Sequence, residues 1–285
     1  MNGRGKLIEM AERKEGAPRV AASSYLNSVP LIWSFMQGTR QHEVALITDT
    51  APARCADMLA RAEVEAALVP VIEYQRIPEL AVVPGVCVGS RERVRSVVLV
   101  MRDDLNGLRN VRRVALDNSS RTSAALVQII FREFLKCEPE WTTRVPDLAA
   151  MLKENDAALM IGDPGMNFSR EHLVVYDLAE LWREHTGLGF VFAIWMARER
   201  EMERVRRIDF AAARDEGLEH VEEIASFYRG AVNLQFDEIK SYLLENISYE
   251  LDEELRAGLN LFYHLAQKHG IIREVRPLKI IGRST

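Results

Sequence analysis

Two short clusters of hydroxyl and amide side chains each lie between an apolar run and an amphipathic segment. The first spans residues 23–28, SSYLNS, and the second spans residues 117–124, DNSSRTSA. Each cluster is predicted to be a loop that leads from a strand into a helix. The first turn of a helix has backbone N–H groups without intrahelical partners, and these groups bind carboxylates and phosphates. Each cluster therefore suggests a binding site for a small anionic group.

In the first cluster, Asn27 and Ser28 are predicted to cap the following helix, and Pro30 suits its first turn. Asn27 can both donate and accept a hydrogen bond, so we expect it where the ligand is held. A simple capping loop without a ligand is the alternative interpretation of the same residues.

The second cluster brings several hydroxyl groups to a predicted helix start, which suits a carboxylate or a phosphate. The alternative is a capping cluster in which Asp117 or Ser119 bonds to the backbone. Arg121 either pairs with an acidic ligand or points outward from the first turn. The residues alone leave both pairs of alternatives open.

Two glycine-containing segments follow predicted secondary structure. In residues 160–166, MIGDPGM, Gly162 permits close approach of the backbone, and Asp163 either caps the next turn or faces a cleft. Gly187 and Gly189 precede a long apolar run. They either relieve strain when two lobes close or are only turn residues.

Apolar runs at about 18–22, 43–48 and 65–69 alternate with helical segments, which predicts a βαβαβ order. A second set of strands begins at 112–118, and from Arg198 onward the pattern is helical only. Two α/β units followed by a helical segment predict a chain that crosses twice between lobes. The runs RSVVLVM and GFVFAIW are the expected crossings, at the floor of a cleft where ligands bind. The predicted boundaries are 18–97 with 196–285 for lobe one, 98–195 for lobe two, and 1–17 for a flexible extension without an assigned function.

Composition excludes several classes of protein. The net charge of −5 and the pI near 5.8 provide no basic surface for nucleic acid or an anionic membrane. Cys55, Cys87 and Cys137 are far apart and predict reduced packing thiols, and the six histidines lack the spacing of a metal site. No nucleotide-binding glycine motif and no G-x-S-x-G motif occurs. The first eighteen residues contain no apolar signal core, so we expect a cytoplasmic protein.

Five segments carry a resemblance to a known family when they are taken in order. They are YLNSVPL, ALVPVIEY, DNSSRTSAAL, MIGD and GLGFVFAIW, and they extend over roughly residues 18–265. This set resembles chorismate dehydratase of the futalosine route to menaquinone. The resemblance implies an α/β fold like that of type II periplasmic binding proteins, with a ligand between two lobes. It also implies dehydration of chorismate to 3-enolpyruvylbenzoate without a metal or an organic cofactor.

The resemblance also implies roles for individual residues. Asn27 is the expected catalytic residue. Chorismate has two carboxylates, and the cluster in each lobe is expected to bind one of them. Position 71 is Val where some relatives carry a polar residue, so no ligand contact is expected there. The expected substrate-binding residues are Tyr25, Ser28, Ser120, Arg121, Thr122, Ser123, Gly162 and Asp163, with Ser120, Thr122 and Ser123 as the carboxylate cradle.

The matched motifs contain amide and hydroxyl groups but no evident His or Glu base. We therefore expect the enolpyruvyl carboxylate of the substrate to take the proton, with Asp163 and Glu73 as reserve candidates. The competing hypotheses are the related 1,4-dihydroxy-6-naphthoate synthase, whose opening motif does not fit YLNSVPL, and a protein that only binds a small anion. A ligand-sensing domain of a regulator is less well supported because the terminal helices carry little basic charge.

Overall fold

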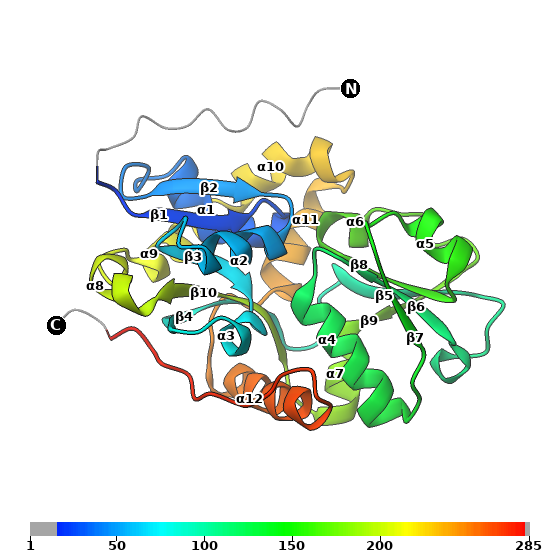
Figure 1. Ribbon diagram of the computed structural model, residues 1–285. Coiled ribbons are helices and arrows are strands. Elements are labelled where there is room, and N and C mark those ends of the chain that lie inside the picture. Colours follow the sequence, from blue (N-terminus) through cyan, green and yellow to red (C-terminus); the bar gives the residue numbers. More distant parts are fainter. Residues whose placement is uncertain (1–15, 283–285) are drawn as a thin grey trace.

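The structure is a computed structural model that describes residues 16–282. It contains two five-stranded sheets that lie beside each other, each with helices packed on it (Figure 1). The expected extension at 1–17 falls outside the described residues, apart from Gly16 and Ala17. Within residues 16–282, no helix combines the length and the apolar character needed to cross a membrane.

The first sheet has the strand order β2-β1-β3-β10-β4. Strand β1 is parallel to β2 and β3, whereas β10 is antiparallel to β3 and β4. The strands are β1 (Arg19–Ser23), β2 (Ala45–Asp49), β3 (Ala66–Pro70), β4 (Leu80–Ser90) and β10 (Phe190–Arg198).

The second sheet repeats this pattern with the order β7-β6-β8-β5-β9. Strand β6 is parallel to β7 and β8, and β5 is antiparallel to β8 and β9. The strands are β5 (Val97–Arg102), β6 (Arg113–Asp117), β7 (Glu140–Arg144), β8 (Ala157–Ile161) and β9 (Leu173–Asp177). The expected α/β fold with two lobes is confirmed.

The apolar runs become the central strands. Every residue of β3, AALVP, and of β8, AALMI, is buried. A strand that is covered on both faces needs apolar side chains in both directions, so these runs do not alternate with polar residues. The strands β2 and β7 lie at sheet edges and are only partly buried.

Helices follow the strands in the order that the sequence predicts. Those between the strands of the first sheet are α1 (Val29–Met36), α2 (Pro52–Ala60) and α3 (Glu73–Arg76). Those of the second sheet are α4 (Arg121–Ile129), α5 (Leu148–Glu154), α6 (Gly162–Met166) and α7 (Leu178–Thr186), and α4 continues into a π-helical turn at Ile130–Leu135. After β10 come α8 (Met202–Val205), α9 (Phe210–Glu219), α10 (Val221–Val232), α11 (Phe236–Ser241), a π-helical turn at Tyr242–Asn246, and α12 (Glu253–Lys268).

The second crossing lies earlier in the chain than the predicted boundary after residue 195. Strand β10 pairs with β3 and β4, and Trp195 lies opposite Leu68, so residues 190–195 belong to the first sheet. The chain crosses at 91–96 and again at 187–189, between elements of different sheets. An apolar, aromatic run has the same composition in a crossing and in a central strand, so only its pairing partners distinguish the two.

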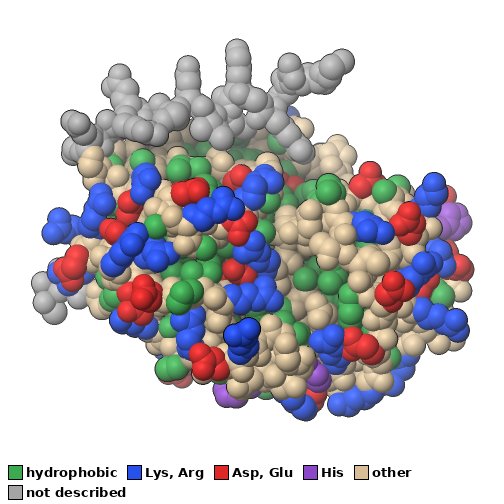
Figure 2. All heavy atoms as spheres, in the orientation of Figure 1, with side chains coloured by type: hydrophobic (Ala, Val, Ile, Leu, Met, Phe, Trp, Pro, Cys, Tyr) green, Lys and Arg blue, Asp and Glu red, His purple; other side chains and the backbone are tan. Residues whose placement is uncertain are grey.

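Charged side chains of both signs share the surface. On the face shown in Figure 2, Lys and Arg are interspersed with Asp and Glu. This mixture is typical of solvated surface and does not concentrate one sign of charge.

Helix α1 begins just after the first polar cluster, and Glu216 of α9 anchors its far end. The Glu216 carboxylate accepts hydrogen bonds from the Ser34 hydroxyl and from the backbone and hydroxyl of Thr39, and it pairs with Arg40 at 2.9 Å. Burial acts to raise the pKa of Glu216, but these donors outweigh it and lower the pKa to about 2. The ionised carboxylate therefore stabilises the folded state.

We expect Glu216→Gln to reduce the free energy of unfolding at pH 7 by about 1–3 kcal/mol, because charge-assisted hydrogen bonds are lost. The folded-state pKa lies below the ordinary value, so the contribution is complete above about pH 4.5 and declines as the pH falls toward 2. Urea unfolding of the wild type and of Glu216→Gln at pH 7, 4 and 3 measures the difference in their unfolding free energies. A difference that does not shrink with falling pH would show that the charge of Glu216 is not the cause.

Candidate active site between the two sheets

A pocket lies between the two sheets, and residues from both of them line it. The first-sheet side contributes Ser23, Tyr25, Asn27, Ser28, Pro52, Leu68, Pro70, Val88, Phe192 and Ala193. The second-sheet side contributes Val97, Ser120, Thr122, Ser123, Ile161 and Gly162. Both predicted clusters therefore reach one pocket, whereas Arg121 and Asp163 are not among the lining residues.

The first cluster follows β1 as a 3₁₀ turn at Leu26–Ser28 that leads directly into α1. Ser28 is the N-cap of α1, but its side chain makes no capping hydrogen bond. Its hydroxyl instead donates to Asn27 Oδ1 at 3.2 Å and lies 3.4 Å from the Ser23 hydroxyl. The predicted side-chain cap is wrong, because the 3₁₀ turn directs these groups to the pocket.

The second cluster turns at the end of β6. Asp117 Oδ1 accepts hydrogen bonds from the backbone N–H of Ser119 at 2.8 Å and from its hydroxyl at 2.6 Å. Ser120 is the N-cap of α4 and makes no side-chain capping bond. Asp117 thus holds the loop through the backbone, and Ser120 lines the pocket together with Thr122 and Ser123.

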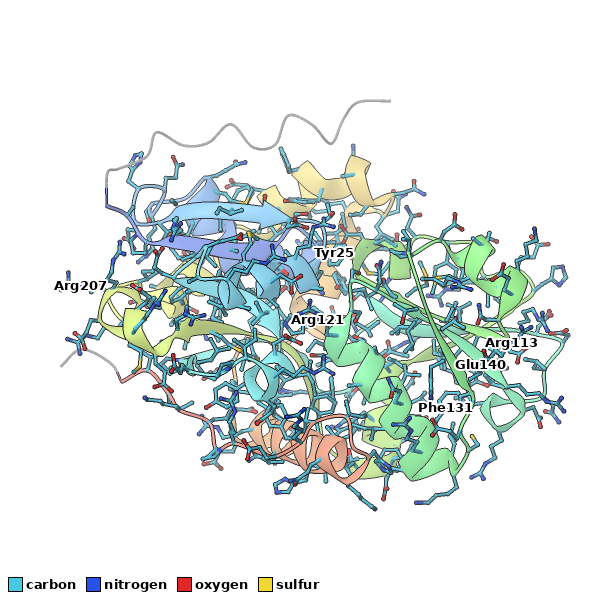
Figure 3. The ribbon with its side chains drawn as sticks, in the orientation of Figure 1. Tyr25, Arg113, Arg121, Phe131, Glu140 and Arg207 are labelled. Carbon is cyan, nitrogen blue, oxygen red and sulfur yellow. The ribbon has the colours of Figure 1, made fainter. Side chains whose placement is uncertain are left out.

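Arg121 and Thr122 join the start of α4 to the first sheet's half of the protein. Thr122 Oγ1 accepts a hydrogen bond from the Ile72 N–H at 3.2 Å. The Arg121 guanidinium pairs with Asp57 of α2 at 2.6 Å and with Glu73 of α3 at 3.0 Å. Figure 3 shows Arg121 and Tyr25 at the boundary between the two halves. In this structure Arg121 bridges the lobes and does not contact the pocket.

The MIGD segment also contacts the first cluster. Gly162 has a φ of +62°, and a Cβ at this position would lie 2.6 Å from ring atoms of Tyr25. Glycine is therefore required by backbone conformation and by close packing. Asp163 Oδ1 accepts a hydrogen bond from the Leu26 N–H at 3.0 Å, and it does not cap α6, whose N-cap is Ile161. Asp163 thus joins the two lobes beside the pocket.

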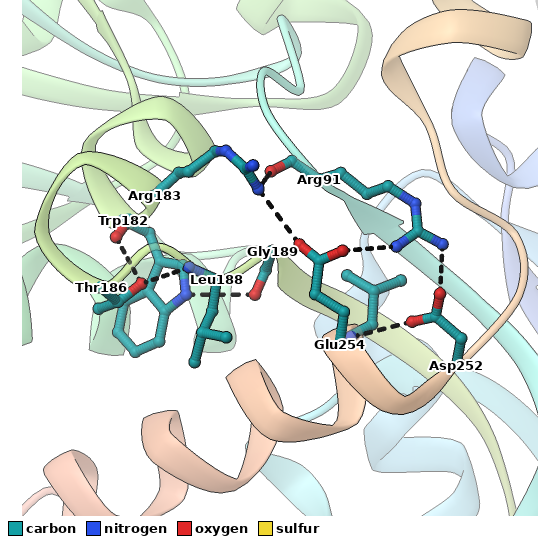
Figure 4. A network of polar contacts seen from close by, with 9 residues as sticks. Arg91, Trp182, Arg183, Thr186, Leu188, Gly189, Asp252 and Glu254 are labelled. Atoms are coloured by element: carbon teal, nitrogen blue, oxygen red, sulfur yellow. Dashed lines mark hydrogen bonds and ion pairs between the residues drawn. The ribbon is translucent and has the colours of Figure 1, made fainter.

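The first crossing is tied to α7 and to α12 (Figure 4). Arg183 Nη1 donates to the Arg91 carbonyl at 2.9 Å and pairs with Glu254 at 3.1 Å, while Arg91 pairs with the same Glu254 at 3.0 Å. Gly187 ends α7 in the left-handed conformation, and Gly189 packs closely on α12. Both glycines have structural roles in turning and packing the second crossing.

The polar part of the pocket lining is uncharged. Among the lining residues in the described part of the chain there is no Asp, Glu, His, Lys or Arg. Burial raises the pKa of Tyr25 to about 12, and the nearby charge of Asp117 acts in the same direction. Tyr25 is therefore protonated at neutral pH. The pocket offers hydroxyl and amide groups to a ligand and contains no group that is a base at pH 7.

The reserve candidates for a base are engaged elsewhere. Glu73 is buried and pairs with Arg76 at 3.2 Å as well as with Arg121. Val71, where no ligand contact was expected, is buried outside the pocket lining. Sequence reasoning missed Phe192 and Ala193 of β10, which line the pocket. The run 189–195 was expected at the floor of the cleft, but its uniformly apolar composition does not show which of its side chains face the pocket.

We expect Arg121→Ala to lower the free energy of unfolding by about 1–3 kcal/mol, since Glu73 stays buried with Arg76 as its remaining ion-pair partner. Urea unfolding measures the loss of free energy. Small-angle X-ray scattering reports whether more molecules have separated lobes. Arg144→Ala is the matched control because it removes the exposed pair with Glu154 within the second lobe, which is expected to cost about 0.5 kcal/mol or less. Equal losses of unfolding free energy in the two variants, with no increase in the radius of gyration, would contradict a bridging role of Arg121.

Comparison with known proteins places this geometry in a family. A family model described as menaquinone biosynthesis matches residues 18–268. A chorismate dehydratase from Thermus thermophilus is 30% identical over 230 residues, which cover 74% of this chain and 83% of that protein.

Two solved structures are similar in fold. A protein from Archaeoglobus fulgidus superposes with a TM-score of 0.73 at 18% sequence identity. The superposition covers 91% of this chain and 100% of the Archaeoglobus chain. A Candida albicans protein described as having the generic periplasmic binding protein fold superposes with a TM-score of 0.67 at 12% sequence identity. The superposition covers 94% of this chain and 98% of the Candida chain. The fold is thus that of periplasmic binding proteins. The family model matches most of the chain, and this protein belongs to the menaquinone biosynthesis family.

Proposed function

We propose that this protein is a chorismate dehydratase, a hydro-lyase that converts chorismate to 3-enolpyruvylbenzoate in the futalosine route to menaquinone. The observation that supports this most directly is a pocket whose polar lining comes from both lobes and contains no charged side chain. The family match and the 30% identity to a protein named chorismate dehydratase support the same proposal.

The pocket has a helix start from each lobe, and these two helix starts suit the two carboxylates of chorismate. The helices α1 and α4 begin at the pocket, one in each lobe, and neither N-cap side chain caps its helix. Helix N-termini favour anions through unpaired N–H groups and the helix dipole. Ser120 and Ser123 would bind one carboxylate together with Thr122, and Asn27 and Ser28 would bind the other side of the ligand.

The reaction removes one water. The C–H bond breaks at the ring carbon that carries the enolpyruvyl ether, and the C–OH bond breaks at its neighbour. The electron pair of the C–H bond forms the last double bond of an aromatic ring, and the electron pair of the C–OH bond leaves with hydroxide. The base that takes the proton passes it to hydroxide, which gives water. The gain in aromatic stabilisation makes the elimination strongly favourable, so the base that removes the proton need not be a strong one.

The proton acceptor would be the enolpyruvyl carboxylate of the substrate. The pocket lining of the described chain holds no carboxylate or imidazole, and burial keeps Tyr25 protonated with a pKa of about 12. A general base must lie within hydrogen-bond reach of the proton that it removes. Asn27 would hold that carboxylate or the departing hydroxyl through its amide. The lining also lacks the Cys, His and carboxylate side chains that bind metal ions.

Incubation of the purified protein with chorismate, with and without a chelator, tests the reaction. We expect an aromatic product lighter than chorismate by one water, formed at the same rate in both samples and identified by chromatography with mass spectrometry. Unchanged chorismate would contradict the proposal and would favour the naphthoate-forming enzyme or a binding protein.

The Asn27→Asp variant tests the role of Asn27. A negative charge beside a dianionic substrate removes an amide donor and adds repulsion, so we expect turnover to fall on the order of 100-fold. Asn260→Asp introduces the same charge at an exposed position on α12 and is the matched control, with activity expected to equal that of the wild type. Near-normal turnover of Asn27→Asp would disprove the assigned role.

A further inference from the structure

The turn that carries Asn27 depends on another part of the chain for its cap. This 3₁₀ turn, Leu26–Ser28, has Tyr25 as its N-cap residue, and the Tyr25 side chain makes no capping hydrogen bond. Helix caps are usually short polar side chains such as Ser or Asp, whose oxygen reaches the first N–H groups. Leu26 is fully buried, so its N–H needs an acceptor from elsewhere.

The second lobe provides that acceptor. Asp163 of α6 accepts the hydrogen bond from the Leu26 N–H through Oδ1 at 3.0 Å, although the two residues are 137 positions apart in the chain. The preceding residue, Gly162, packs against the Tyr25 ring so closely that a Cβ would lie 2.6 Å from the ring atoms. The start of α6 thus contacts this turn at two successive residues, once by packing and once by a hydrogen bond.

Two neighbouring helix starts of the first lobe donate to the second lobe in the same way. The Ala53 N–H in the first turn of α2 donates to the Ser119 carbonyl at 3.3 Å. The Ile72 N–H at the start of α3 donates to Thr122 Oγ1 at 3.2 Å. The N-cap residues of these helices, Ala51 and Ile72, have apolar side chains that cannot cap them. The segments after β1, β2 and β3 therefore all find acceptors on the second lobe.

The position of Asn27 in the pocket depends on two sets of hydrogen bonds. Within the first lobe, the Ser28 N–H donates to the Tyr25 carbonyl at 2.8 Å, and the Ser28 hydroxyl donates to Asn27 Oδ1 at 3.2 Å. These bonds fix the shape of the turn but not its position relative to the second polar cluster, which lines the other side of the pocket. The bond to Asp163 is a direct polar link between the two sides.

We propose that Asp163 is a positioning residue, which caps the turn from the opposite lobe and thereby places the Asn27 amide opposite the second polar cluster. In this role the carboxylate accepts a hydrogen bond from the backbone and does not take the proton of the substrate. The proposal deepens the function proposed above, because its consequence for turnover depends on Asn27 contacting chorismate. The hydrogen bond from Leu26 to Asp163 does not depend on that function.

Two substitutions of Asp163 separate positioning from proton transfer. Asp163→Ala removes the acceptor, and we expect kcat to fall about 10- to 100-fold while KM changes by less than about threefold, since a displaced catalytic group reacts more slowly. Asp163→Asn keeps a side-chain oxygen that accepts from the Leu26 N–H but cannot act as a base, so kcat should stay within about threefold of wild type.

Either variant can overturn the proposal. An Asp163→Asn variant as slow as Asp163→Ala would show that the charge matters and would favour Asp163 as the base. A wild-type rate in Asp163→Ala would show that the turn needs no cap from the second lobe. Should Asp163→Ala not fold, Asp163→Asn tests the proposal by itself, because a large loss of kcat in that variant contradicts it.

Asp147→Ala is the matched control. Asp147 also accepts a backbone hydrogen bond at 3.0 Å, from the Ala150 N–H, but it is exposed and caps α5 within the second lobe. Its loss removes the same kind of bond and leaves the contact between the lobes intact, so both kinetic constants should stay within about twofold of wild type. A fall in kcat like that of Asp163→Ala would count against positioning, because any lost cap would then have the same effect.

A double-mutant cycle tests whether the effect of Asp163 passes through Asn27. If it does, Asp163→Ala should change turnover by less than about twofold in an Asn27→Ala background, because the group that Asp163 positions is already absent. Equal fractional losses in the wild-type and Asn27→Ala backgrounds would assign Asp163 a general structural role and disprove the proposal.

The Leu26 amide signal gives a readout that does not depend on turnover. Labelling with ¹⁵N-leucine and ¹³C-carbonyl tyrosine selects the two leucines that follow a tyrosine, Leu26 and Leu243, and a Leu243→Ile sample tells them apart. Asp163→Ala should shift the Leu26 signal and speed hydrogen exchange of this amide about tenfold, whereas Asp163→Asn and Asp147→Ala should not. An unchanged Leu26 signal in Asp163→Ala would refute the proposal, whereas a wild-type protein inactive on chorismate would refute only the proposed function.

Discussion

Hydrogen bonds and ion pairs between the two lobes hold the two sides of the pocket together, and the geometry of the site depends on them. The Leu26 N–H reaches Asp163, the Ile72 N–H reaches Thr122, and Arg121 bridges to the first lobe. Each interaction has one partner on each lobe. Together these interactions fix the position of one side of the pocket lining relative to the other.

The distribution of charge around the pocket follows from the cost of burying ions. A buried charge without a partner is expensive, so an empty pocket lined by Arg or Lys would need compensating acids. Here the lining is neutral, and the nearby Arg121 is already compensated by Asp57 and Glu73. Hydroxyls and helix N-termini can bind a dianion in the closed form without leaving unpaired charge in the empty form.

Proteins of this fold share the two lobes and the cleft, so the fold alone does not distinguish a receptor from an enzyme. The side chains within the cleft make the distinction. The neutral lining of the described chain contains no residue that is a base at pH 7, which supports the proposal that the substrate itself provides the base. The hydrogen bond from the Ser28 hydroxyl to Asn27 Oδ1, at 3.2 Å, holds the oxygen end of this amide.

The sequence by itself determined the alternation of strands and helices and the position of both polar clusters. Buried strands need continuous apolar runs, and helix starts favour small polar residues, so both features are visible locally. The resemblance of the sequence to chorismate dehydratase also predicted that 23–28 and 117–124 serve one ligand, because chorismate has two carboxylates. Both clusters do line a single pocket.

Only the tertiary structure decided which residues meet across long distances in the chain. It showed that 190–195 pairs within the first sheet, that Arg121 bonds to Asp57 and Glu73, and that Asp163 accepts from Leu26. These outcomes depend on the partner that each group finds, and an apolar run or a charged side chain has several potential partners. Local composition cannot choose among them because the choice is made by the packing of the two lobes.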